Sequence, residues 1–195
     1  MISFLRGRVE DKEEDYIDLN VNSVGYRIYM SKPSIEKIEE DKEVKILTYM
    51  RVLQDDVSLF GFLNKEEKNM FELLLSVGGV GAKTAIQILG NISPSSFALA
   101  IISNDQNALK KLPGIGPKTA GRIILELKDK IKTEQANSSD DVKEIKNKVD
   151  ISDDLIEALI VLGYKRYQIN EILPKIKEIE LENQIREALT YLANI

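Results

Sequence analysis

Residues 112–120 read LPGIGPKTA, and residues 77–86 read VGGVGAKTAI. The two stretches align at an offset of 35, and both contain G-(V/I)-G-x-K-T-A. Glycines at this close spacing favour a tight turn, because glycine adopts φ > 0 at no steric cost. Apolar residues at helical spacing flank both stretches, so we predict that each one joins two helices.

The region around the two motifs carries further helix signals. Asn64 and Glu67 have the spacing of a capping box, and Ser93-Pro94 offers an N-cap followed by a proline at the first helical position. We therefore predict helices after Asn64, after the first motif, and over residues 95–102, 107–111 and 119–131.

The first 63 residues have the pattern of strands. Residues 16–21 alternate apolar and polar side chains, and Asn22-Ser23 is typical of a hairpin connection. Further strands are predicted near the N-terminus and over residues 24–30, 44–53 and 57–62, whereas residues 34–41 fit a short helix or a solvated loop. Five short strands favour a small barrel of the OB type, although an SH3-like barrel would give a similar pattern.

The C-terminal part begins with a polar, charged stretch that we expect to be a flexible linker. Beyond it, apolar residues at helical spacing predict a three-helix module over 152–162, 166–176 and 182–193, with Gly163 ending the first helix. The expected fold class is multi-domain α+β. Its parts are a barrel (1–63), a helical domain with the repeated motif (64–132), the linker (133–149) and the module (150–195).

Composition excludes several classes of function. The 195 residues include no Cys and no His, which removes disulfides, thiolate chemistry, the commonest general base and the commonest zinc ligand. No apolar run approaches the roughly 18 residues that a membrane span needs. We expect a soluble cytoplasmic protein that is not an enzyme by itself and that has no metal site and no cofactor.

Charge is distributed unevenly along the chain. Residues 1–63 hold 9 Lys or Arg and 13 Asp or Glu, and residues 133–195 hold 8 and 13. Residues 64–132 hold 10 and 6, so this segment has a net charge of +4 although the whole chain has −5. Because both motifs lie in the basic segment, we expect an anionic partner there.

The repeated motif has the chemistry of a phosphate cradle. A helix that begins after a glycine turn presents unpaired backbone N–H groups and the positive end of its dipole, and glycine lets an anion approach closely. We predict sequence-independent DNA backbone contacts, because no base-reading side chains are evident. An alternative is that the turns only join antiparallel helices; a nucleotide-binding P-loop is excluded by spacing. The candidate residues are Gly79, Gly81, Lys83 and Thr84 in the first copy, and Gly114, Gly116, Lys118, Thr119 and Arg122 in the second.

The paired motifs of residues 64–132 resemble a tandem helix-hairpin-helix DNA-binding domain. The order of all the parts resembles the RuvA family, the Holliday-junction-binding subunits of the bacterial branch migration complex. The resemblance is carried by MISFLRGRV at the start, LFGF, LPGIGPKTA and EALIVLGY, and it covers essentially the whole chain. It departs at Gly78, where the second copy has Pro113. The resemblance implies a homotetramer, or an octamer on DNA, that spreads a four-way junction on one face and contacts the minor-groove sides of its arms.

The resemblance also implies two further sites. Asp55 and Asp56 match an acidic pin that repels phosphates at the crossover, whereas on sequence alone an Asp-Asp pair is ordinary turn chemistry. Leu159, Leu162 and Tyr164 match the surface that binds the hexameric RuvB motor, which consumes the ATP. The two leucines fit the module's core equally well, and Tyr164 is expected at the surface. The RuvC resolvase is a further expected partner.

Two other functions stay open at this point. Helix-hairpin-helix elements also occur in structure-selective nucleases and in glycosylases, and Asp129 would be the candidate catalytic residue of a glycosylase. A third hypothesis is a scaffold in which the C-terminal module is the main functional part.

Overall fold

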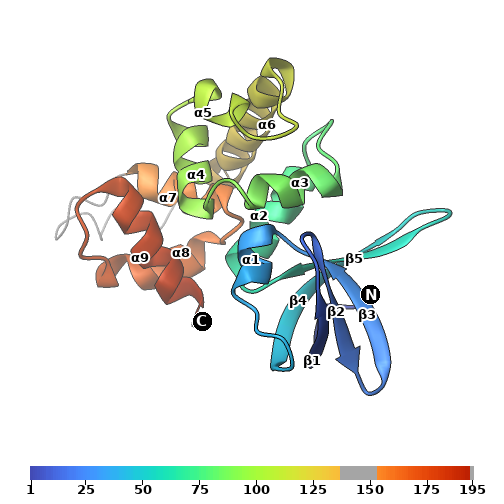
Figure 1. Ribbon diagram of the computed structural model, residues 1–195. Coiled ribbons are helices and arrows are strands. Elements are labelled where there is room, and N and C mark those ends of the chain that lie inside the picture. Colours follow the sequence, from blue (N-terminus) through green and yellow to red (C-terminus); the bar gives the residue numbers. More distant parts are fainter. Residues whose placement is uncertain (137–152, 194–195) are drawn as a thin grey trace.

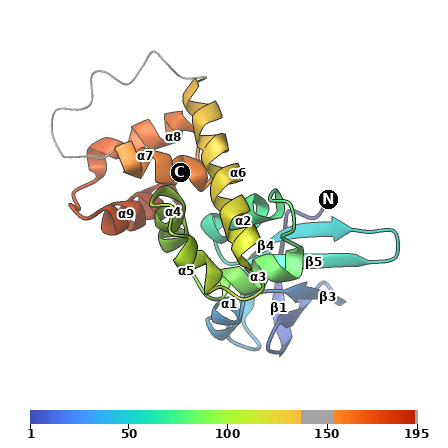
Figure 2. The same cartoon turned by 90° about the horizontal axis from the view of Figure 1, so that it is seen from above.

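The computed structural model describes residues 1–136 and 153–193, and side chains up to residue 128 and from residue 154 (Figure 1). It consists of an N-terminal β-barrel, a central group of helices and a C-terminal group of helices. In Figure 2, which is seen from above, the C-terminal helices lie on the side of the central helices away from the barrel.

The barrel has the five predicted strands. They are β1 (Phe4–Lys12), β2 (Tyr16–Val21), β3 (Val24–Tyr29), β4 (Glu43–Val52) and β5 (Val57–Phe62). The barrel closes in the order β1-β2-β3-β5-β4, and only the β3–β5 pair is parallel. The short helix α1 (Lys32–Glu36) lies between β3 and β4. Residues 34–41, predicted as a short helix or a loop, therefore begin as the end of this helix and continue as a turn.

Alternation in β2 decides which face points into the barrel. Ile17 and Leu19 are completely buried, whereas Asp18 faces outward and accepts two hydrogen bonds from Arg27 of β3, at 2.8 and 3.0 Å. The connection at Asn22-Ser23 has φ of 52° and 68°. Two residues with positive φ form the type I′ turn that matches the twist of a hairpin, so the predicted hairpin is confirmed.

Five helices form the central domain. They are α2 (Lys65–Leu75), α3 (Ala82–Leu89), α4 (Pro94–Ile102), α5 (Gln106–Lys110) and α6 (Pro117–Ala136). The predicted caps are present: the Glu67 N–H donates to the Asn64 side chain at 2.8 Å, and the Ser96 N–H donates to the Ser93 hydroxyl at 3.2 Å. Helix α6 is longer than expected and includes residues 133–136; the rest of the predicted linker lies outside the described residues.

An aromatic cluster joins α2 to the barrel. Phe71 of α2 is completely buried, and its ring centroid lies 5.3 Å from Tyr49, 5.3 Å from Phe60 and 4.9 Å from Phe62. Tyr49 belongs to β4, and the two phenylalanines belong to β5. The central helices are therefore anchored on the two strands that carry the Asp55-Asp56 hairpin.

The C-terminal module has the three predicted helices, α7 (Asp153–Val161), α8 (Arg166–Ile172) and α9 (Leu181–Ala193), with a 3-10 turn, η1 (Leu173–Lys175). Gly163 ends α7 as predicted: its φ is +84°, its N–H donates to Ile160 O at 2.9 Å, and the Tyr164 N–H donates to Leu159 O at 3.1 Å. This is the Schellman pairing of a helix C-terminus.

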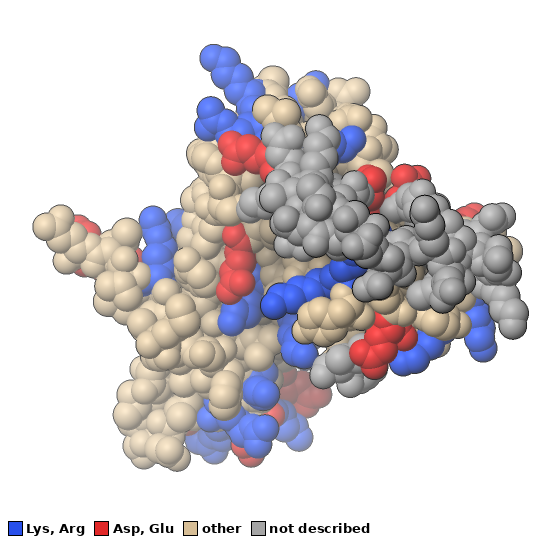
Figure 3. Space-filling view, turned by 180° about the vertical axis from the view of Figure 1, so that it is seen from behind, with Lys and Arg blue, Asp and Glu red and all other residues tan. Residues whose placement is uncertain are grey.

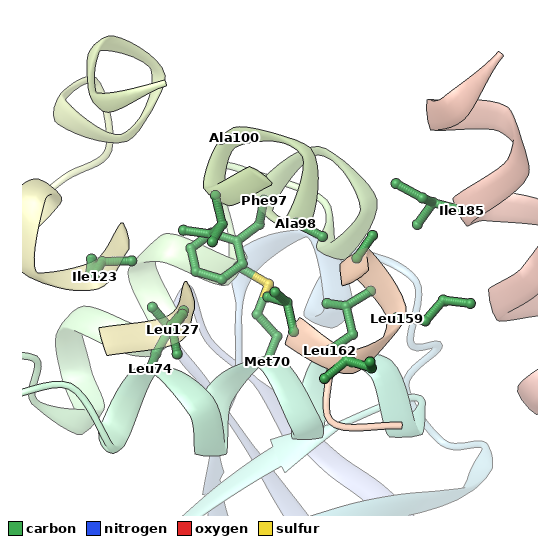
Figure 4. Close-up of a cluster of buried hydrophobic side chains, with 14 of the residues drawn as sticks. Met70, Leu74, Phe97, Ala98, Ala100, Ile123, Leu127, Leu159, Leu162 and Ile185 are labelled. Atoms are coloured by element: carbon green, nitrogen blue, oxygen red, sulfur yellow. The ribbon is translucent and has the colours of Figure 1, made fainter. Parts of the chain in front are cut away.

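The module shares one apolar core with the central helices. Helix α7 packs against α4 and α6, and α9 packs against α4 and α2. Figure 4 shows Leu159 of α7 and Leu162, which directly follows α7, beside Met70 of α2 and Phe97 of α4, and all four side chains are completely buried. The module is thus docked on the helical domain in this structure.

Within the described residues, no single helix is long and apolar enough to cross a membrane. Helices α3 and α4 reach that length only when taken together, and they are bent by 102° at their junction.

Replacing Phe71 by Ala should lower the free energy of unfolding by about 3–5 kcal/mol, because it leaves a cavity between α2 and the barrel. Urea denaturation followed by circular dichroism measures this change. The control is Phe4→Ala, since that ring is 54% exposed and its removal should cost below about 1 kcal/mol. Equal effects of the two substitutions would show that the aromatic cluster does not anchor the helices.

Candidate nucleic-acid interface

The two repeated stretches form equivalent turns. One turn joins α2 to α3 and the other joins α5 to α6. In each, the same backbone hydrogen bond closes the turn: Val80 N–H to Val77 O at 3.1 Å, and Ile115 N–H to Leu112 O at 3.2 Å. The four side chains of these residues are buried. Each turn is therefore fixed from beneath by two apolar residues, and its glycines stay at the surface.

The first glycine of each G-x-G has a conformational role. Gly79 has φ of +94° and Gly114 has φ of +75°. A residue with a side chain rarely adopts this left-handed region. These two glycines are accounted for by the turns themselves.

The second glycine of each pair has a different environment. Gly81 and Gly116 are exposed and lack positive φ, and a Cβ built on either one would have no heavy atom of the described chain within 4 Å other than those of the glycine and its two chain neighbours. Neither backbone conformation nor internal packing requires glycine there. What remains is free access from outside to the start of α3 and α6, where first-turn N–H groups have no helical partner. An anion can therefore approach the backbone closely at Gly81 and at Gly116, and we call these two helix starts the corners.

Two cations stand beside these corners. Lys83 and Lys118 occupy the same place in the two copies, and both are exposed. Among the residues that the structure describes, neither forms an ion pair. In Figure 3, basic side chains project from the end of the molecule at which α5 and α6 lie. The charge at each corner is thus available to a partner.

Thr119 is half-buried near the start of α6. Thr84 is half-buried too, but it lies against the other turn: a Cβ on Gly114 would come within 3.0 Å of its Cγ2. Arg122 also reaches across, since its Nη1 donates to the Gly78 carbonyl at 2.9 Å. Both residues were predicted from sequence to contact DNA, and their contacts with the opposite turn were missed. The signal for one of them was Gly78, a position at which the two copies differ, since the second copy has Pro113.

The β4–β5 hairpin projects from the barrel with Asp55 and Asp56 at its tip (Figures 1 and 2). The Leu53 N–H donates to the Asp56 carbonyl at 2.7 Å, and the Ser58 hydroxyl donates to the Asp56 carboxylate. In the described part of the chain, no Lys or Arg pairs with either carboxylate. Two uncompensated negative charges are therefore held away from the body of the protein.

The three residues that were predicted to bind a motor are buried. Leu159 and Leu162 are completely buried, and Tyr164 is only 6% exposed, so the expectation that Tyr164 lies at the surface is wrong. Its hydroxyl donates to the Glu66 carboxylate of α2 at 2.9 Å. Burial raises the pKa of the Tyr164 phenol far above its usual range, and the adjacent Glu66 raises it further, so the phenol stays protonated as a donor.

Asp129, the candidate catalytic residue of a helix-hairpin-helix glycosylase, lies in the part of α6 whose side chains are not described. No group of three or more His, Cys, Asp or Glu residues that could hold a metal ion is found in the described ranges.

Comparison with known proteins finds matches along most of the chain. Residues 1–61 match the RuvA N terminal domain, residues 71–129 match the SAM-like helix-hairpin-helix tandem, and residues 150–193 match the RuvA, C-terminal domain. A protein of Acetivibrio thermocellus is 44% identical over 99% of both chains. One of Lachnospira eligens is 40% identical over 97% of this chain and 95% of its own, and one of Clostridium perfringens is 35% identical over 98% and 99%. All three are named Holliday junction branch migration complex subunit RuvA.

The open glycine corners can be tested by Gly81→Ser and Gly116→Ser. Serine is a better N-cap than glycine, and Ser93-Pro94 already begins α4 in this way, so the melting temperature should be unchanged or higher. The added side chain occupies the space of an incoming anion. Loss of one or two charge-assisted hydrogen bonds should weaken DNA binding roughly tenfold or more in a fluorescence anisotropy titration.

The matched control is Gly25→Ser in β3. Gly25 is exposed, and a Cβ on it would also meet no atom of the described residues within 4 Å. DNA binding by the control should equal that of the unmodified protein. Wild-type affinity in both corner variants would mean that nothing approaches these corners.

Proposed function

This chain belongs to the RuvA family, and on that basis we propose that it binds Holliday junctions as a subunit of a branch migration complex in homologous recombination and DNA repair. The observation that carries the proposal is the pair of open corners at Gly81 and Gly116, each at a helix N-terminus beside an exposed lysine. The relatives that align with this chain over nearly their full length are named as such a subunit, so the same activity is the simplest one for these corners.

The proposed DNA contacts are made to phosphates. Backbone N–H groups and lysine ammonium groups bind a phosphate in the same way whatever base it carries, so they position the duplex without reading sequence. The two equivalent corners would hold one arm at two places along its backbone. Recognition of a junction would then depend on how several subunits arrange the arms.

The Asp55-Asp56 hairpin is proposed to act at the crossover. In a homotetramer with four-fold symmetry, four such hairpins would place eight carboxylates close to the axis. Negative charge at that place repels phosphates and favours separated strands. The carboxylates are suited to this role because they are exposed and unneutralised within the described residues.

The C-terminal module is proposed to bind the RuvB motor hexamer, which would supply ATP hydrolysis. Because Leu159, Leu162 and Tyr164 are buried against the central helices, contact through these side chains requires the module to leave its docked position. The described module also exposes two large apolar side chains, Tyr167 and Ile179, which are accessible in the docked arrangement.

We propose no catalytic step, metal or cofactor for this chain, in keeping with a sequence that lacks His and Cys. RuvC resolvase is proposed as a further partner, and the cytoplasm, where bacterial DNA lies, as the place of action.

Incubation of a four-way junction with the protein and Mg²⁺ should leave all four strands intact on a denaturing gel. Cleavage would favour a structure-selective nuclease instead.

Lys83→Ala and Lys118→Ala should each weaken junction binding and flatten its salt dependence. Loss of one phosphate contact lowers the slope of log K against log salt by about 0.9 for each bound subunit. Titrations of a four-way junction between roughly 50 and 200 mM salt measure the slope. The experiment includes a linear duplex of the same sequence, which should bind more weakly. Equal affinity for junction and duplex would refute junction recognition.

Neutralising the hairpin by Asp55→Asn and Asp56→Asn together should tighten junction binding several-fold at low salt, because eight repulsive charges are removed from a tetramer. The gain should shrink as salt screens the repulsion, and it should be absent on a linear duplex. Glu39→Gln with Glu40→Gln is the control, since it removes the same charge from an exposed part of the barrel domain. An equal gain from the control pair would assign the effect to net charge alone.

A further inference from the structure

Two contacts link the two copies of the motif. In each contact, a side chain on the helix that follows one turn reaches the backbone of the other turn. From α6, Arg122 Nη1 donates to the carbonyl oxygen of Gly78 in the first turn at 2.9 Å. From α3, the Cγ2 methyl of Thr84 lies where it would meet a Cβ on Gly114 of the second turn at 3.0 Å. The contacts are reciprocal, so each helix touches the turn that belongs to the other copy.

Gly78 fits the Arg122 guanidinium closely. A Cβ built on Gly78 would lie 3.0 Å from Nη1, 3.7 Å from Cδ and 3.8 Å from Cζ of Arg122. Gly78 does not have positive φ, so its backbone does not require glycine. A side chain at this position, where the second copy has Pro113, would press on the guanidinium and displace it.

The Arg122 side chain is also held on its own helix. Its Nε lies 3.7 Å from Glu126 Oε1, one turn further along α6. Since the guanidinium is planar and its donors have fixed directions, these two partners restrict its orientation. The side chain is 56% exposed, so its loss should not prevent folding.

We propose that Arg122 is a positioning residue, which together with Thr84 fixes the separation of the two phosphate-binding corners. This inference rests on the proposed function, because it concerns how the two corners work together on DNA. Duplex phosphates have a fixed spacing, so a pair of corners at a matching fixed separation binds without first being ordered. Once one corner is bound, the second encounters its phosphate at a high effective concentration.

The separation itself is measured without DNA. The chain has no cysteine, so Gln87→Cys on α3 and Lys110→Cys on α5, both exposed, give unique spin-label sites. Labelled protein is mixed with an excess of unlabelled protein, so that pulsed EPR reports the distance within one chain. Arg122→Ala should broaden the distance distribution. A distribution as narrow as in the unmodified protein would overturn the proposal.

Lys128→Ala is the matched control for this measurement. Lys128 also lies on α6 and also donates to a backbone carbonyl, Ile102 O, at 2.9 Å, but that contact holds α4 and not a turn. The control variant should keep the narrow distribution. Equal broadening in both variants would show that the separation responds to any loss from α6, and would also overturn the proposal.

Salt titrations distinguish positioning from direct contact. Arg122→Ala should weaken junction binding about tenfold and leave the salt slope unchanged, whereas a slope lowered by about 0.9 per subunit would identify Arg122 as a phosphate ligand. Gly78→Ala should weaken binding only when Arg122 is present; an equal loss in the Arg122→Ala background would contradict the contact. If the protein does not bind junctions at all, the proposed function fails, while the EPR result still decides whether Arg122 sets the separation.

Discussion

The structure depends on a constraint at two short turns: the backbone must face outward where a partner approaches, while the same turn must be fixed by the core. Val77 and Val80 in one turn, and Leu112 and Ile115 in the other, meet the second requirement by burial. The glycines between and after them meet the first. A turn with a less buried base would present the same N–H groups with less definite geometry, and a turn without glycine would cover them.

The remaining architecture keeps these turns in a defined relation to the acidic hairpin. Phe71 packs on Tyr49, Phe60 and Phe62, which belong to the strands that continue into the hairpin. The helix that carries Phe71 ends at the first turn. The proposed phosphate-binding corners and the proposed repulsive hairpin are thus connected through one aromatic cluster, which would suit a protein that holds duplex arms and separates strands at once.

Much of the fold could be predicted from sequence because its signals are local. The five strands, the caps at Asn64 and Ser93, the end of α7 at Gly163 and the repeated turns all follow from patterns spanning a few residues. The end of α6 was missed because the apolar period stops while good helix formers, Glu134, Gln135 and Ala136, continue. Tyr164 was misplaced, although the residue after a C-terminal glycine often contacts the preceding helix turn. Its partner Glu66 is 98 residues away, and no local pattern indicates it. The contacts of Thr84 and Arg122 were missed for the same reason.

The two copies of the motif are alike in sequence, yet they are not interchangeable. The first copy has an open position at Gly78 that receives the arginine, and the second has a rigid Pro113 and supplies that arginine. A chain built from two first copies would lack the arginine, and a chain built from two second copies would place a proline side chain against the guanidinium. The two halves are therefore alike in the buried base and the open glycine of each turn, and they differ where one turn contacts the helix of the other copy.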